Sequence, residues 1–110
     1  MDNNSKTIFD YIPVQAHSVI AKYIKKYPVK FKISKQRHTK HGDYRLYHDG
    51  FEQISVNSNL SSYRFLITLI HEISHLVSYN FYGKNIKPHG EEWKKTYKYL
   101  MDPFLNSNVF

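Results

Sequence analysis

The stretch LITLIHEISHLVSYNFYGKNIKPHGEEW, from Leu66 to Trp93, decides most of what the sequence predicts about this chain. It holds three histidines, and the first two, His71 and His75, stand among Leu, Ile and Val residues. An imidazole in an apolar setting has to satisfy two ring nitrogens away from bulk water. The question is therefore what occupies the nitrogens of His71, His75 and His89.

A metal ion is the interpretation that the spacing favours. His71, Glu72 and His75 form the pattern H-E-x-x-H. Residues four apart on a helix project from the same side, so both imidazoles can hold one ion, with each nitrogen about 2.0–2.1 Å from zinc. Glu72 is then placed to contact a water held by the ion rather than the ion itself. The alternative is two core histidines that are satisfied by backbone groups or water.

The residues around the motif predict a long helix, which Ser61 or Ser62 caps and Gly83 ends. At about 100° per residue the two histidines lie opposite an apolar stripe. The stripe consists of Leu66, Ile70, Ile73 and Val77. The helix is thus predicted to be apolar on one side and to carry chemistry on the other.

A zinc site needs a third protein ligand, and His89 is the next histidine along the chain. Tyr82 lies about 10 Å beyond His75 along the helix, and the segment from Gly83 to His89 spans about 20 Å when extended, enough to return. Glu91 and Glu92 are rival ligands. We favour His89 because the glycine that follows it lets the backbone turn the ring inward.

The remaining sequence predicts an α+β domain with three helices packed on a small three-stranded mixed sheet. We expect one domain over residues 1–110, with residues 1–10 loosely held. Its further elements are a helix that starts at Pro13 and stops at Pro28, a strand over residues 29–34, a Gly42-Asp43 turn, a hairpin over residues 44–57 around Asp49-Gly50, and a helix over residues 91–101 that Pro103 closes.

Composition excludes several classes of protein. The chain of 110 residues has no cysteine, which rules out disulfides and Cys-ligated zinc or iron–sulfur sites. The N-terminus lacks the basic and apolar regions of a signal peptide, and no apolar run is long enough to span a bilayer. We therefore expect a cytoplasmic protein, without membrane attachment and monomeric.

The charge is one-signed over a long segment. The net charge is +7, and no acidic residue occurs from Tyr11 to Gly42. Such a surface attracts polyanions, of which nucleic acid is the commonest, although a solvated basic face explains it equally well. The candidate contacts are Lys22, Lys25, Lys26, Lys30, Lys32, Lys35, Arg37 and Lys40.

The motifs HEISH and HGEEW, with TKHGDYR and ISVNSNL upstream, resemble the SprT-like metallopeptidases, which include the Spartan proteases. The resemblance covers about Phe31 to Met101. It implies a zincin-like fold, one Zn²⁺ held by His71, His75 and His89, and Glu72 as general base. It also implies an association with DNA, single-stranded DNA above all, where Spartan-type members cleave crosslinked proteins.

Two features depart from that family. Many members carry a Cys-rich zinc ribbon, which this chain lacks, so it is either a piece of a longer protein or a ribbon-less member. The Spartan-type DNA-binding regions are absent too. We expect a zinc-dependent metallopeptidase that hydrolyses peptide bonds of a protein substrate with a zinc-activated water, with Tyr44, Tyr79 or Tyr82 as oxyanion stabiliser. The alternative is a basic nucleic-acid-binding domain whose zinc site is structural or degenerate.

Overall fold

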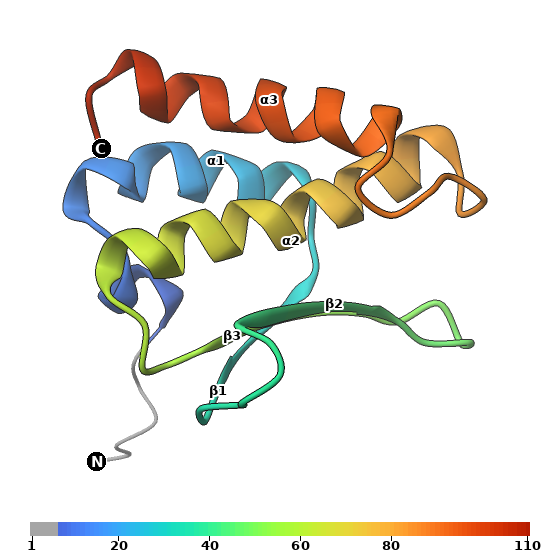
Figure 1. Ribbon diagram of the computed structural model, residues 1–110, viewed down its shortest axis with the longest axis horizontal. Helices are drawn as coiled ribbons and strands as arrows, with labels where there is room; N and C mark the ends of the chain where they lie inside the picture. Colours follow the sequence, from blue (N-terminus) through green and yellow to red (C-terminus); the bar gives the residue numbers. More distant parts are fainter. Residues whose placement is uncertain (1–6) are drawn as a thin grey trace.

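The structure is a computed structural model that describes residues 7–110. All three α-helices lie on one side of a small sheet (Figure 1), which confirms the predicted α+β fold of three helices and three strands. The elements are two 3-10 helices, Ile8–Tyr11 and Val14–Ala16, then α1 (His17–Lys26), β1 (Lys30–Ser34), β2 (Gly42–Leu46), β3 (Glu52–Asn57), α2 (Ser62–Tyr82) and α3 (Glu91–Asn106).

The sheet is mixed, as expected, with the strand order β1-β3-β2. β1 runs parallel to the central strand β3, and β2 runs antiparallel to it as one arm of a hairpin. Gly50 turns that hairpin with a φ of 90°, a backbone conformation that glycine adopts without strain. The two inward residues predicted on β3, Ile54 and Val56, are 0% and 1% exposed.

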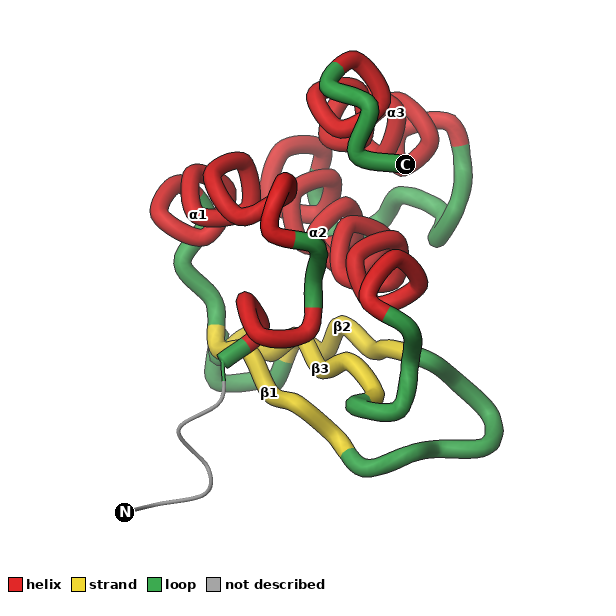
Figure 2. Tube along the Cα trace, turned by 90° about the vertical axis from the view of Figure 1, so that its left-hand side faces the viewer, coloured by secondary structure: helices red, strands yellow, loops and turns green. Residues whose placement is uncertain are grey.

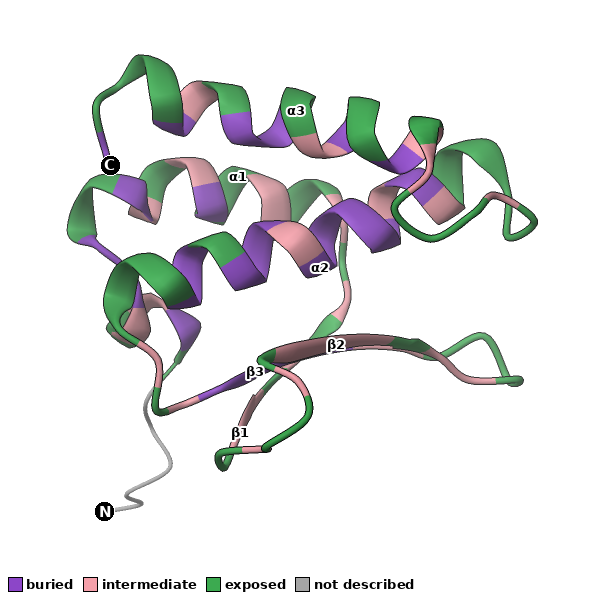
Figure 3. Cartoon of the chain, in the orientation of Figure 1, coloured by how far each residue is buried: buried purple, intermediate pink, exposed green. Residues whose placement is uncertain are grey.

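Helix α2 is the central element of the core. It packs against β2 and β3 on one side and α3 on the other, and Figure 2 shows the sheet beneath the helices. The Ser61 hydroxyl caps it by accepting from the Arg64 amide, and Gly83 ends it, both as predicted. Most of its length is buried (Figure 3), because its apolar residues fill the space between the layers.

Two turn and stop predictions were wrong. Pro103 does not end the last helix, because α3 continues to Asn106 and seats Phe104 in the core at 0% exposure. Burial of that ring outweighs the one helical hydrogen bond that a proline cannot donate. Gly42 and Asp43 do not form a turn either, but begin β2.

The first helix begins later than predicted, because Pro13 precedes a short 3-10 helix and α1 starts at His17. The expectation of loose packing at the N-terminus lies outside the described residues for positions 1–6, whereas Ile8 is buried in the core. None of the helices within residues 7–110 is long and apolar enough to cross a membrane.

Candidate metal centre

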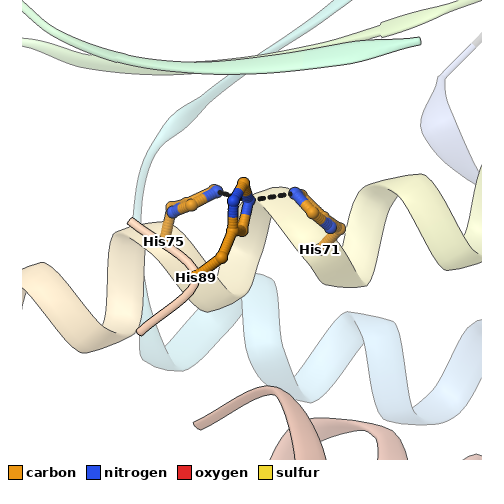
Figure 4. A group of neighbouring side chains, drawn as sticks. All are labelled: His71, His75 and His89. Carbon is orange, nitrogen blue, oxygen red and sulfur yellow. Dashed lines mark hydrogen bonds between the residues drawn. The ribbon is translucent and has the colours of Figure 1, made fainter. Parts of the chain in front are cut away.

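Three histidines from two distant segments converge beside α2 (Figure 4). His71 and His75 come from consecutive turns of that helix, and His89 comes from the loop before α3. The Nε2 atom of His89 lies 2.9 Å from Nε2 of His71 and 3.1 Å from Nε2 of His75. The predicted set of three residues is therefore brought together, and it could hold a metal ion.

The donor chemistry of this cluster fits a cation better than hydrogen bonds. An imidazole nitrogen carries either one proton or one lone pair in the ring plane. The His89 Nε2 atom therefore serves one of its two neighbours and not both. A cation placed among the three nitrogens accepts all three lone pairs at once, so the geometry suits a metal ion.

The two helical histidines are held in the neutral form that metal binding needs. Burial, together with the neighbouring His71 and His89, lowers the pKa of His75 to about 4. Burial, followed by His89, also lowers the pKa of His71. Both side chains are therefore neutral near pH 7, and each has one ring nitrogen with a lone pair that can bind a metal ion.

Trp93 is the aromatic partner of the whole cluster. Its ring centroid lies 4.8 Å, 5.5 Å and 4.7 Å from those of His71, His75 and His89. Its indole nitrogen and the Nδ1 atom of His75 are both buried, and neither has a hydrogen-bond partner within residues 7–110. On the opposite side the Tyr44 ring of β2 stacks on His75 at 6.4 Å. Trp93 is the aromatic residue that closes the HGEEW motif, on which the family resemblance partly rests.

His89 reaches the cluster through its own backbone conformation. Its φ is 60°, in the left-handed region that costs a residue other than glycine about 1–3 kcal/mol. The positive φ lies at His89 and not at Gly90, which has an extended backbone at the N-cap of α3 and packs closely on Lys87, where a Cβ atom would lie 3.0 Å from Cβ of that residue. The rival Glu91 is exposed and pairs with Lys94 at 3.9 Å. Strain of this kind is typical of functional positions.

Glu72 lies next to the cluster and is 7% exposed. Burial and the nearby Asp43 raise the pKa of its carboxyl to about 7, against the opposing effect of Arg37 and Lys40. Gly42 makes room for this side chain. A Cβ atom on Gly42 would lie 2.6 Å from Cγ2 of Thr68 and 3.1 Å from Oε2 of Glu72. Glycine early in a strand can signal such a close approach, which the sequence interpretation missed.

A buried network fixes the segment that leads into Gly42. The Asn57 side chain accepts from Nε of Arg37 at 2.7 Å and donates to the Lys40 carbonyl at 2.8 Å. Arg37 also donates from Nη1 to the Ser55 hydroxyl at 2.9 Å. The backbone N–H of Asn57 donates to the backbone carbonyl of His41. Loop residues 37–41 are thereby tied to β3.

The eight basic residues predicted to contact nucleic acid fall into two groups, which differ in whether the side chain is paired within the protein or exposed. Arg37 is half-buried within the network around Asn57, and Lys40 pairs with Asp43 at 3.4 Å. The other six side chains are exposed on α1, on β1 and just after β1. They are Lys22, Lys25, Lys26, Lys30, Lys32 and Lys35.

The three tyrosines proposed to stabilise an oxyanion differ in their surroundings. The Tyr44 hydroxyl donates to Glu52. The Tyr79 ring lies 5.8 Å from that of His75, and its hydroxyl makes no hydrogen bond within residues 7–110. Tyr82 is 44% exposed and makes an edge-to-face contact with Phe81. Tyr44 and Tyr79 therefore flank the cluster.

Comparison with known proteins agrees with the geometry. The curated relatives include Protein SprT of Pseudomonas fluorescens (strain SBW25) and of Pseudomonas aeruginosa (strain LESB58), each 48% identical over 27 residues. That match covers 24% of this chain and only 16% of each relative. No solved structure gave a significant match. The SprT-like family itself matches residues 12–109, nearly the whole chain, and the chain therefore belongs to the SprT-like family.

Proposed function

We propose that the chain is a zinc-dependent metallopeptidase of the SprT-like type. The observation that carries the proposal is the convergence of His71, His75 and His89, with Glu72 buried beside them on the same helix. Three neutral imidazoles and an adjacent carboxylate are the set that a hydrolytic zinc site requires. We assign the three histidines as the Zn²⁺ ligands.

A zinc ion at this site would polarise a peptide carbonyl and lower the pKa of a coordinated water toward about 7. Glu72 has the role of general base, and a carboxyl with a pKa of about 7 is suited to accept a proton at neutral pH and to return it to the leaving amine. The ring of Trp93 packs against all three histidines, and the ring of Tyr44 packs against His75. Tyr79, whose ring packs against His75 and whose hydroxyl makes no hydrogen bond within residues 7–110, is the favoured oxyanion stabiliser.

Replacement of the general base tests this proposal. Glu72→Gln keeps the size of the side chain but removes proton transfer, so we expect cleavage of unfolded casein to fall about 100-fold or more. Zinc content, measured by elemental analysis, should stay near one ion per chain. Glu91→Gln, the same change at an exposed position, is the control and should retain activity. A fully active Glu72→Gln protein would contradict the mechanism.

A structural zinc site in a nucleic-acid-binding module is the competing function. Structural zinc sites are closed by four protein ligands. The metal-binding group found within residues 7–110 consists of three histidines and no fourth residue, which favours a site with an open position.

We further propose that DNA binds the exposed basic face, with the predicted contacts reduced to the six exposed lysines. If about four phosphates are contacted, affinity for a single-stranded oligonucleotide should fall with a log–log salt slope of about −3. Charge reversal at Lys30, Lys32 and Lys35 should weaken binding, measured by fluorescence anisotropy. Unchanged binding by that triple variant would exclude the face.

A further inference from the structure

A pocket of about 530 Å³ opens beside the metal centre on its His71 side. One wall is the α2 face that carries Arg64, Ile67 and Thr68, and the other is the segment 40–42. His71 and Glu72 line the same pocket. A group bound there would therefore lie next to the reacting peptide bond of any substrate.

The charge of the pocket is predominantly positive. Lys40 and Arg64 line it, and Glu72 is the only acidic residue to do so within the described chain. Lys40 is partly neutralised by its pair with Asp43. Arg64 has no ion pair within residues 7–110, so its guanidinium is available to a ligand. A guanidinium recognises a carboxylate by two parallel hydrogen bonds.

The pocket also offers apolar surface. Tyr63 and Ile67 are 46% and 41% exposed and line it together with Arg64. Glutamate and aspartate side chains combine a hydrocarbon stem with a terminal carboxylate, whereas a nucleic-acid phosphate has no such stem. The mixed lining therefore favours an acidic side chain over a phosphate.

The loop wall is rigid before any ligand binds. Asn57, 1% exposed, holds the carbonyl oxygens of Lys40 and His41 by hydrogen bonds of 2.8 Å each. A wall that is already ordered avoids the entropy cost of ordering on binding.

We propose that this pocket is a specificity subsite that takes an acidic side chain of the protein substrate, with Arg64 as the residue that reads its charge. The inference rests on the proposed peptidase function and adds its substrate preference. Arg64 could have been found from the sequence, because it lies seven residues, or about two helical turns, before His71 and shares its face. We missed that signal.

Binding of matched peptides tests the subsite without relying on cleavage. The zinc-loaded Glu72→Gln protein would be titrated with fluorescein-labelled decapeptides that differ only in having Glu, Gln or Lys at one scanned position. We expect one position at which Glu binds about five- to tenfold more tightly than Gln. Adding Arg64→Glu should reverse the preference, so that Lys binds best at that position. Adding Lys98→Glu instead is the control, because Lys98 is an exposed residue of α3 outside the pocket.

Every other outcome overturns the inference. If no scanned position distinguishes Glu from Gln, whether or not binding is measurable, an acidic subsite is excluded. If Lys98→Glu weakens the preference for Glu as much as Arg64→Glu does, that preference is an effect of net charge. Binding of oligo(dT) that depends on Arg64, without a Glu preference, would assign the pocket to phosphate. Casein cleavage by the wild type decides the proposed function separately, since an active enzyme without the preference refutes only the subsite.

Discussion

Two clusters of polar side chains lie within this small fold, and they are satisfied in opposite ways. The first joins Asn57, Arg37 and Ser55 by hydrogen bonds of 2.7–2.9 Å, and only the Nη2 atom of Arg37 is left without a partner. In the second, His71, His75 and His89 direct three nitrogens at one point, which protons alone leave incompletely paired.

The contrast separates structure from function. A buried polar group without a partner costs about 1–3 kcal/mol, so a protein retains such groups only where something compensates for them. The Asn57 cluster compensates internally and ties a loop to the sheet. The histidine cluster has no such internal compensation, and we propose that a cation supplies it; the strained backbone at His89 adds to the cost of assembling the cluster. Mutations in the two clusters should therefore have different signatures.

The largest effect is expected from His75→Ala. It removes a ligand, so the variant should lose stoichiometric zinc and all peptidase activity. With zinc at about 1,000 times its dissociation constant, the ion adds about 4 kcal/mol to the free energy of unfolding of the wild type. Thermal unfolding with and without EDTA measures this contribution. The wild type should be destabilised by the chelator, and His75→Ala should be indifferent to it.

His48→Ala is the matched control for that experiment. His48 is exposed on the β2–β3 hairpin, far along the chain from the cluster. Its loss should leave zinc content and the response to EDTA unchanged. If His75→Ala binds zinc as the wild type does, the metal centre has been assigned to the wrong residues.

Asn57→Ala is expected to have the next largest effect, with the opposite signature. It removes the acceptor for Arg37 and the donor to the Lys40 carbonyl, so we expect a loss of about 3 kcal/mol of stability. Zinc content should be unchanged, because no ligand is touched. Denaturant unfolding measures the loss, with the exposed Asn59→Ala as control. Loss of zinc at full stability would show that the two clusters are coupled.

The sequence predicted the histidine cluster better than the Asn57 cluster, and the reason is periodicity. A helix repeats every 3.6 residues, so the joint orientation of His71 and His75 is a local property. The return of His89 required only a loop-length argument. The pairing of Arg37 with Asn57 depends on a contact across 20 residues, and no local pattern encodes it.

A run of basic residues does not reveal which of its side chains turn inward. Arg37 stands in a basic segment and was assigned to a nucleic-acid surface, but its guanidinium reaches into the protein. Pro103 and Gly42 were interpreted by their usual local roles as helix stop and turn. In both cases tertiary packing decided the outcome: Phe104 seats in the core, and Gly42 gives Glu72 space.

The smallest effect on stability is expected from removing a single hydrogen bond that lies outside both clusters. The Tyr23 hydroxyl donates to the Leu100 carbonyl at 2.7 Å and links α1 to α3. Tyr23→Phe keeps the ring and its edge contact with Phe104, so we expect a loss of about 1 kcal/mol, with zinc content and activity unchanged. If Tyr23→Phe lost as much stability as Asn57→Ala, the number of hydrogen bonds in a network would not determine the stability lost on mutation.

The stability difference between the wild type and Tyr23→Phe should depend on pH if the Tyr23 hydroxyl causes it. Burial raises the pKa of the Tyr23 hydroxyl to about 12 in the folded protein, above its ordinary value of 10.0. Between these values the unfolded chain releases a proton that the folded chain retains, so the contribution of Tyr23 is complete below pH 10 and is lost as the pH rises through about 12. In urea titrations at pH 8 and pH 11, the advantage of the wild type over Tyr23→Phe should therefore shrink at the higher pH. An advantage that stays constant would point to packing rather than to the hydroxyl.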